Sequence, residues 1–198
     1  MILLIWIKFP KKKSSSVKTD KQVVGVFDKK LLKIFANALS NLDIKFAWIV
    51  NSEDGLDEIS PYAKTNIVQL KDKKITEIII DPKKLNIDAD NFENLVGSDS
   101  KFNAKKMIDI FKGEDNDFSK AVCLNASAGL VVSGKYEKFE LAYNYSRDFI
   151  MSGAPYKHLV KIQNAWKHSW KNHKKEKWKS NRFKKNYFTR LVKWTNKK

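Results

Sequence analysis

The acidic residues between positions 53 and 58 are the first group in the chain whose types and spacing could do chemistry. Four carboxylates follow the apolar run 46–50 within six residues, namely Glu53, Asp54, Asp57 and Glu58. Adjacent carboxylates repel one another unless a cation neutralises them, and oxygen is the ligand atom that Mg²⁺ prefers. The spacing leaves two interpretations open, which are a hard-cation site on Asp57 and Glu58 or a solvated acidic turn.

The elements expected before this loop form a βαβ unit. Residues 22–27 alternate and are rich in β-branched side chains, as in a strand, and Asp28 can cap a following helix. Apolar residues then recur at helical spacing from Lys30 to Leu42, and 46–50 is predicted as a second strand. Such a unit predicts a parallel strand pair, whose ligands bind beyond the carboxyl ends of the strands. The acidic loop falls at that end.

A hairpin is expected next along the chain. Residues 66–70 and 75–80 are predicted as antiparallel strands joined by the turn 71–74. Together with the βαβ unit, this hairpin predicts an α/β fold with a mixed sheet flanked by helices.

The remaining elements are expected to be helices, at 88–95, 100–111, 118–133 and 136–151 and from Pro155 onward. The helix 100–111 is expected to turn four apolar side chains inward, namely Phe102, Met107, Ile108 and Phe111. Asn125 lies in the small, apolar stretch 118–133. We expect its side chain to bond a neighbouring backbone group rather than a ligand.

Three short motifs occur in the order seen in one known enzyme family. They are QVVGVFD at 22–28, DGLDEIS at 54–60 and LNASAGL at 124–130. On these motifs the chain resembles the C-terminal half of anthranilate phosphoribosyltransferase, an enzyme of the glycosyltransferase family 3 type, over residues 17–164. The 54–60 loop is the most specific motif, because it is short, rich in unlike residues and placed after a strand. The pyrimidine nucleoside phosphorylases are a weaker match.

The resemblance implies a partial nucleoside phosphorylase/phosphoribosyltransferase-like domain and an activity. The activity is transfer of phosphoribosyl from phosphoribosyl pyrophosphate to anthranilate in tryptophan biosynthesis, in the cytoplasm, with a homodimer in the full-length family. Mg²⁺ on Asp57 and Glu58 would bridge to the pyrophosphate. In the family, a Gly-rich pyrophosphate loop, a Lys-His-Asn stretch and the arginine that meets anthranilate lie upstream of the matched part. We therefore expect a fragment that is inactive, or nearly so, on its own.

The charge of the chain lies at its two ends. The formal net charge is +17, but residues 23–164 carry twenty basic and twenty acidic groups, whereas 165–198 carry a net +12. We therefore expect three parts, which are 1–16 outside the family match, 17–164 as the α/β domain, and 165–198 as a basic aromatic tail. The tail is expected to be helical only near its junction with the domain.

The tail carries an alternative function. It interleaves thirteen basic residues with aromatic side chains at Trp166, Trp170, Trp178, Phe183, Tyr187, Phe188 and Trp194. Basic groups neutralise phosphates and aromatic rings stack on bases, which predicts a nucleic-acid-binding protein, and a membrane-surface helix is a third interpretation. The apolar start, residues 1–7, is far shorter than the about 20 residues of a membrane span. The single cysteine, Cys123, fits a reducing compartment.

Overall fold

The computed structural model describes residues 19–89 and 91–173. The chain divides into two compact units, Met1–Tyr156 and Lys157–Lys198. The predicted division at 1–16, 17–164 and 165–198 stays a prediction.

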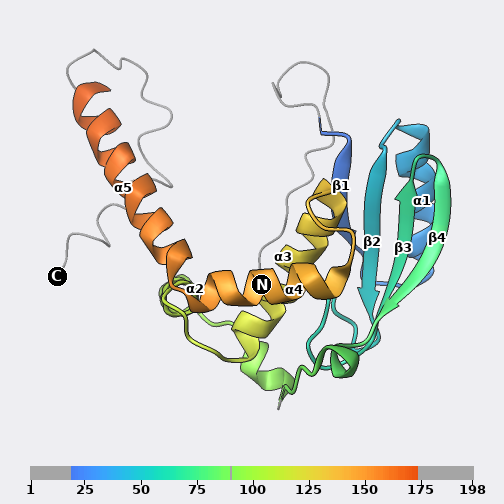
Figure 1. Cartoon of the computed structure of the whole chain (residues 1–198), viewed down its shortest axis with the longest axis horizontal. Helices are drawn as coiled ribbons and strands as arrows, with labels where there is room; N and C mark the ends of the chain where they lie inside the picture. Colours follow the sequence, from blue (N-terminus) through green and yellow to red (C-terminus); the bar gives the residue numbers. More distant parts are fainter. Residues whose placement is uncertain (1–18, 90, 174–198) are drawn as a thin grey trace. The chain divides into compact units, whose positions relative to one another are not determined.

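The first unit is built on a four-stranded sheet with the order β1-β2-β3-β4 (Figure 1). The strands are β1 (Lys21–Gly25), β2 (Phe46–Ser52), β3 (Thr65–Lys71) and β4 (Lys74–Ile80). Strands β1 and β2 are parallel and are connected through helix α1 (Leu31–Asn41), whereas β2, β3 and β4 pair antiparallel. The predicted βαβ unit and hairpin are both confirmed.

The hairpin turn shows why its register is fixed. Lys71 pairs with Lys74, so only Asp72 and Lys73 form the loop, and both have positive φ, 47° and 65°. A two-residue loop with both residues in the left-handed region matches the right-handed twist of the flanking strands. The turn therefore sets the pairing of β3 with β4.

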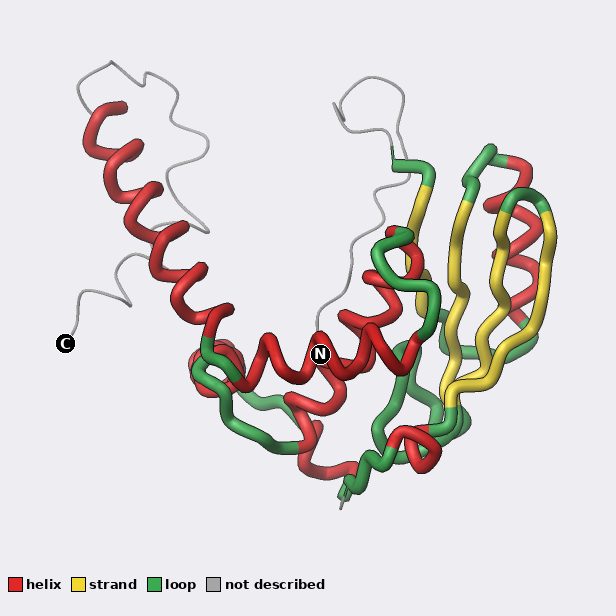
Figure 2. Tube along the Cα trace, in the orientation of Figure 1, coloured by secondary structure: helices red, strands yellow, loops and turns green. Residues whose placement is uncertain are grey.

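Helices cover both faces of the sheet (Figures 1 and 2). On one face, α1 packs on the side chains of Ala47, Ile49, Val68 and Leu70. On the other face, α3 (Asp117–Ser133) and α4 (Phe139–Met151) pack on Trp48, Val50 and Ile67, which alternate with the first set along β2 and β3. All seven residues of β2 are buried. The centre of the three-layered core is therefore β2, the strand that leads into the acidic loop.

The connection between sheet and helices departs from expectation in two places. The helix predicted at 88–95 forms only a short 3₁₀ turn, η2 (Phe92–Leu95), after a first 3₁₀ turn, η1 (Pro82–Leu85). Helix α2 (Ser100–Phe111) has the predicted bounds, and Asp99 caps it by accepting a hydrogen bond from the Phe102 N–H.

The inward face predicted for α2 is wrong in part. Phe102 and Met107 are exposed, at 39% and 40%, while the buried residue is Ile110. Asn103 ties the start of the helix to the preceding loop, since its amide bonds both the N–H and the C=O of Ser98. Ile110 lies in the core cluster with side chains of α3 and α4, and Phe111 packs against that cluster, which leaves Phe102 and Met107 outward.

Helix α5 (Ala154–His173) is the last described element. The part of the chain beyond it, with the predicted tail functions, lies outside the described residues. Across residues 19–89 and 91–173, every helix is too short or too polar to cross a membrane.

Candidate functional site

The acidic loop leaves β2 at Ser52 and turns at once. The Ser52 N–H donates to the Leu56 carbonyl at 2.9 Å, and the Gly55 N–H donates to the Ser52 carbonyl at 3.0 Å. Gly55 adopts φ of +90°, a conformation that residues other than glycine resist. A Cβ at this position would meet no neighbour within 4 Å. Backbone conformation, rather than space, therefore explains glycine at this turn.

Asp54 closes the loop and is a structural residue. One of its carboxylate oxygens accepts from the Ser60 hydroxyl, and the other accepts from the Leu56 N–H at 3.3 Å. The same hydroxyl oxygen accepts from the backbone N–H of Tyr62 at 3.0 Å. Of the four carboxylates grouped in the sequence, Asp54 is thus occupied by the loop itself.

Asn125 of α3 holds the residue that follows Glu58. Its side-chain oxygen accepts from the Ile59 N–H at 2.9 Å, and its nitrogen donates to the carbonyls of Ile59 at 3.0 Å and Ala121 at 2.9 Å. Ile59 is fully buried, so both of its backbone groups need these partners. The prediction that Asn125 serves a backbone group is confirmed, and the group is part of the candidate site.

Gly25 of β1 fixes the other side of the loop. A Cβ at this position would lie 1.8 Å from the carbonyl oxygen of Asp57. The loop can therefore approach β1 this closely only because position 25 is glycine. Asp57 and Glu58 are held between β1 on one side and α3 on the other.

Asp57 and Glu58 differ in environment. Asp57 is exposed, whereas Glu58 is half-buried. Burial raises the pKa of Glu58 to about 7, and the neighbouring charge of Asp57 adds to the rise. A bound cation acts in the opposite direction, because it favours the ionised form of both groups.

The donor set of this pair fits Mg²⁺. Two adjacent carboxylates supply hard oxygen ligands, and Mg²⁺ commonly takes one or two carboxylates and completes its shell with water and substrate phosphate. Among residues 19–89 and 91–173, no group of three or more His, Cys, Asp or Glu side chains is placed to hold a metal. The pair is therefore suited to a shared site rather than an all-protein cage.

Asp117 is a residue of this region that sequence reasoning missed. It is 5% exposed and accepts hydrogen bonds from the Tyr62 hydroxyl at 2.9 Å, the Asn94 amide at 2.8 Å and the Lys120 ammonium at 3.0 Å. Burial acts to raise the pKa of Asp117, but these bonds outweigh it and lower the pKa to about 2. Asp117 thereby ties the chain after the acidic loop to α3. Its position in the first turn of α3 is its one signal in the sequence.

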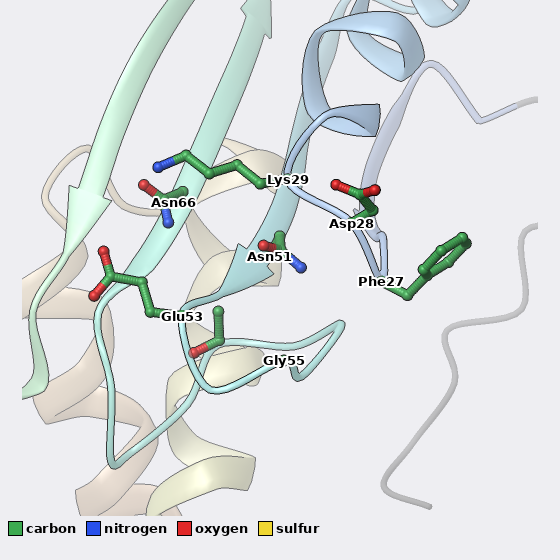
Figure 3. A pocket seen from close by; sticks show the side chains of 8 residues that line it. Phe27, Asp28, Lys29, Asn51, Glu53, Gly55 and Asn66 are labelled. Carbon is green, nitrogen blue, oxygen red and sulfur yellow. The ribbon is translucent and has the colours of Figure 1, made fainter.

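The structure also contains a pocket of about 480 Å³ at the carboxyl ends of β1 and β2 (Figure 3). Its walls include Phe27 and Asp28 before α1, Glu53 after β2, and Asn66 of β3. Asp28 was predicted as a helix cap, but its carboxylate accepts from the N–H of Lys30, which lies one residue before the helix begins. Asp28 is instead one of the residues that line the pocket.

Comparison with known proteins identifies the family. A family model described as "Glycosyl transferase family, a/b domain" matches residues 14–156. The anthranilate phosphoribosyltransferase of Pelagibacter ubique (strain HTCC1062) is 74% identical over 152 residues, which are 77% of this chain and 46% of that protein. The chain thus spans less than half the length of this relative.

Solved structures agree with the assignment. The crystal structure of anthranilate phosphoribosyltransferase from Thermus thermophilus matches with a TM-score of 0.62 and 26% identity, over 69% of this chain and 40% of that one. The Saccharomyces cerevisiae enzyme in complex with phosphoribosyl pyrophosphate and Mg has a TM-score of 0.61 over 71% and 41%. Its 20% identity supports the fold alone. Because the family model matches most of this chain, the chain belongs to the glycosyl transferase family that has this α/β domain.

Proposed function

We propose that this chain supplies the Mg²⁺-binding loop of an enzyme that transfers phosphoribosyl from phosphoribosyl pyrophosphate to anthranilate, in tryptophan biosynthesis and in the cytoplasm. The observation that carries the proposal is the fixed position of Asp57 and Glu58 at the carboxyl end of β2, between Gly25 and Asn125. Ligands of open α/β sheets bind at this end of the strands.

The residues of the loop and of its two supports would have different roles. Asp57 and Glu58 offer the carboxylate oxygens, while Asn125 and Gly25 hold the backbone on either side of them. Bound there, Mg²⁺ would supply positive charge that offsets the charge of the departing pyrophosphate. Glu58 would be ionised in that state, because a neighbouring cation favours the carboxylate.

The substrates and the assembly are part of the same proposal. The Saccharomyces cerevisiae structures hold phosphoribosyl pyrophosphate with Mg and, separately, 4-fluoroanthranilate. We extend both substrate classes to this chain on the strength of the 74% identity to the Pelagibacter ubique enzyme. The part of that enzyme that this chain does not match would contribute the remaining substrate contacts, and the complete enzyme would be a homodimer.

A reconstitution experiment tests the proposal. The chain is co-expressed with the part of the Pelagibacter ubique enzyme that it does not match, and phosphoribosyl transfer to anthranilate is assayed with Mg²⁺. The double variant Asp57→Asn/Glu58→Gln should lower kcat/KM about 100-fold or more, since a catalytic metal stabilises the transition state by several kcal/mol.

A matched control is Glu77→Gln. Glu77 is an exposed carboxylate of β4 outside the loop, paired with Lys33 at 2.7 Å, and its loss should leave the rate unchanged. A reconstituted enzyme whose Mg²⁺-dependent rate survives in the double variant would overturn the assignment of Asp57 and Glu58.

A further inference from the structure

The pocket beside the acidic loop has an unexplained polar wall. Asn51 of β2 and Asn66 of β3 are paired across the sheet, on the face where Ala47, Ile49 and Val68 form the core under α1. Asparagine at this position interrupts an apolar stripe. Buried amides need hydrogen-bond partners, so each of the two requires an explanation.

Asn51 has its partner and Asn66 does not. The Asn51 side chain donates to the Val26 carbonyl at 2.8 Å, which fastens the end of β1 to β2. Asn66 is 9% exposed, and its side-chain nitrogen is buried without a hydrogen-bond partner in the described structure. Figure 3 shows this nitrogen pointing toward the space between Asn51 and Glu53. An unpaired buried N–H costs free energy that an oxygen acceptor in the pocket would recover.

Two other lining residues supply acceptors. The carboxylates of Asp28 and Glu53 line the pocket, and within residues 19–89 and 91–173 neither forms an ion pair. Among the described lining residues Lys29 is the one with a basic side chain, and its ammonium extends toward the strands in Figure 3. The pKa of Glu77 lies below its usual range, mainly because Glu77 is bonded to Lys33. The charge of Lys29 lowers this pKa less strongly.

These groups restrict the chemistry of a ligand. An anion would meet two carboxylates, and a protonated amine has no lone pair with which to accept from Asn66. A hydroxyl group both donates and accepts, so a ligand with several hydroxyls can accept from Asn66 and donate to Glu53 and Asp28. Phe27, 80% exposed, lies at the rim of the pocket with its ring turned away from Asn66.

We propose that this pocket binds a small, neutral polyhydroxylated ring such as a pentose or a hexose, through Asn66, Glu53 and Asp28. The volume of about 480 Å³ lies within the range of small-molecule sites, which is roughly 300–1,000 Å³. The site is separate from Asp57 and Glu58 and does not depend on the proposed metal. A ligand of this size, held by few bonds, should bind with a dissociation constant on the order of 1 mM or weaker.

The test is a titration of the whole chain with D-ribose and with D-glucose, followed by the NMR signals of the Asn66 side-chain amide. At least one sugar should shift these signals in a saturable manner. Asn66→Leu removes the unpaired donor and should weaken sugar binding on the order of tenfold, as read from the backbone signal of Glu53.

Further variants and probes keep the result interpretable. Glu53→Gln keeps the shape of the side chain and should also weaken binding, whereas Glu77→Gln, outside the pocket, should not. Saturable shifts from inorganic phosphate or glycine in the absence of sugar would overturn the assigned ligand class. No saturable shift with either sugar, or equal binding by Asn66→Leu and Glu53→Gln, would overturn the site.

Discussion

The acidic loop and the pocket lie at the same end of the sheet, but they differ in whether their buried polar groups have hydrogen-bond partners. Around the loop, Asp54, Ser60 and Asn125 of α3 bond one another or the backbone, and among the described residues no polar side-chain atom there is left buried and unpaired. In the pocket, the Asn66 nitrogen is buried without a partner among residues 19–89 and 91–173. Satisfied polar groups stabilise a backbone conformation, whereas an unsatisfied one costs stability until a ligand binds. The loop is therefore preformed by the protein, whereas the pocket keeps an unpaired donor for the proposed ligand.

The largest expected effect comes from Gly25→Ala, which breaks the support of the loop. A Cβ only 1.8 Å from the Asp57 carbonyl oxygen forces β1 and the loop apart, at a cost of about 3 kcal/mol or more in the free energy of unfolding. Urea unfolding measures it.

The matched control is Gly129→Ala in the middle of α3. A Cβ there would meet nothing within 4 Å, so alanine should stabilise the helix by up to about 1 kcal/mol. Equal urea midpoints for the two variants would contradict the close approach of β1 to the loop.

Asn125→Ala should have the next largest effect. It leaves the N–H and C=O of fully buried Ile59 unpaired, which costs about 2–3 kcal/mol. Asn103→Ala is the control, because it also removes two bonds to one residue but at an exposed site. Chemical denaturation should separate the two variants, and similar losses would show that Asn125 does not hold the loop.

Acid should weaken the anchor at Asp117. Its folded pKa of about 2 lies below the ordinary 3.8, so its contribution is complete above pH 4 and is lost as the pH falls toward 2. A shift of this size corresponds to about 2 kcal/mol. Unfolding measured from pH 5 to pH 2 should show this loss in the wild type and a smaller loss in Asp117→Asn. Parallel pH profiles of the two proteins would show that Asp117 does not stabilise the fold through these bonds.

The smallest effect is expected from Asn66→Leu and has the opposite sign. Replacing an unpaired buried amide with an apolar side chain of similar shape should leave stability unchanged or raise it by about 1 kcal/mol. A thermal melt compared with Asn51→Leu, which removes the bond to the Val26 carbonyl, sharpens the contrast. Equal destabilisation by both variants would show that Asn66 is satisfied in solution.

The sheet could be predicted from the sequence, because alternation and β-branched residues determine which segments pair. The hairpin turn and the strand before the acidic loop were placed correctly for this reason. The orientation of α2 could not be predicted, because the packing of Ile110 against α3 and α4 decides which of its apolar side chains are buried. Apolar spacing alone does not contain that information.

The site was predicted in part. Asp57 and Glu58 are adjacent at the predicted end of the sheet, and their role as ligands stays a prediction. Asp54 was left out of the predicted pair, but its structural role could not be predicted, because its bond to Ser60 depends on the fold of the loop. Asp117 and Asn66 were missed because a buried polar residue looks like an exposed one until its neighbours are known.

The most direct test of the central claim is a Mn²⁺ titration of the chain, followed by water-proton relaxation. Mn²⁺ accepts the same oxygen ligands as Mg²⁺ and reports binding without the rest of an active site. The wild type should bind one ion weakly, since no substrate phosphate completes the shell. Asp57→Asn/Glu58→Gln should abolish that binding, whereas identical titrations of the two proteins would show that these carboxylates are not a metal site.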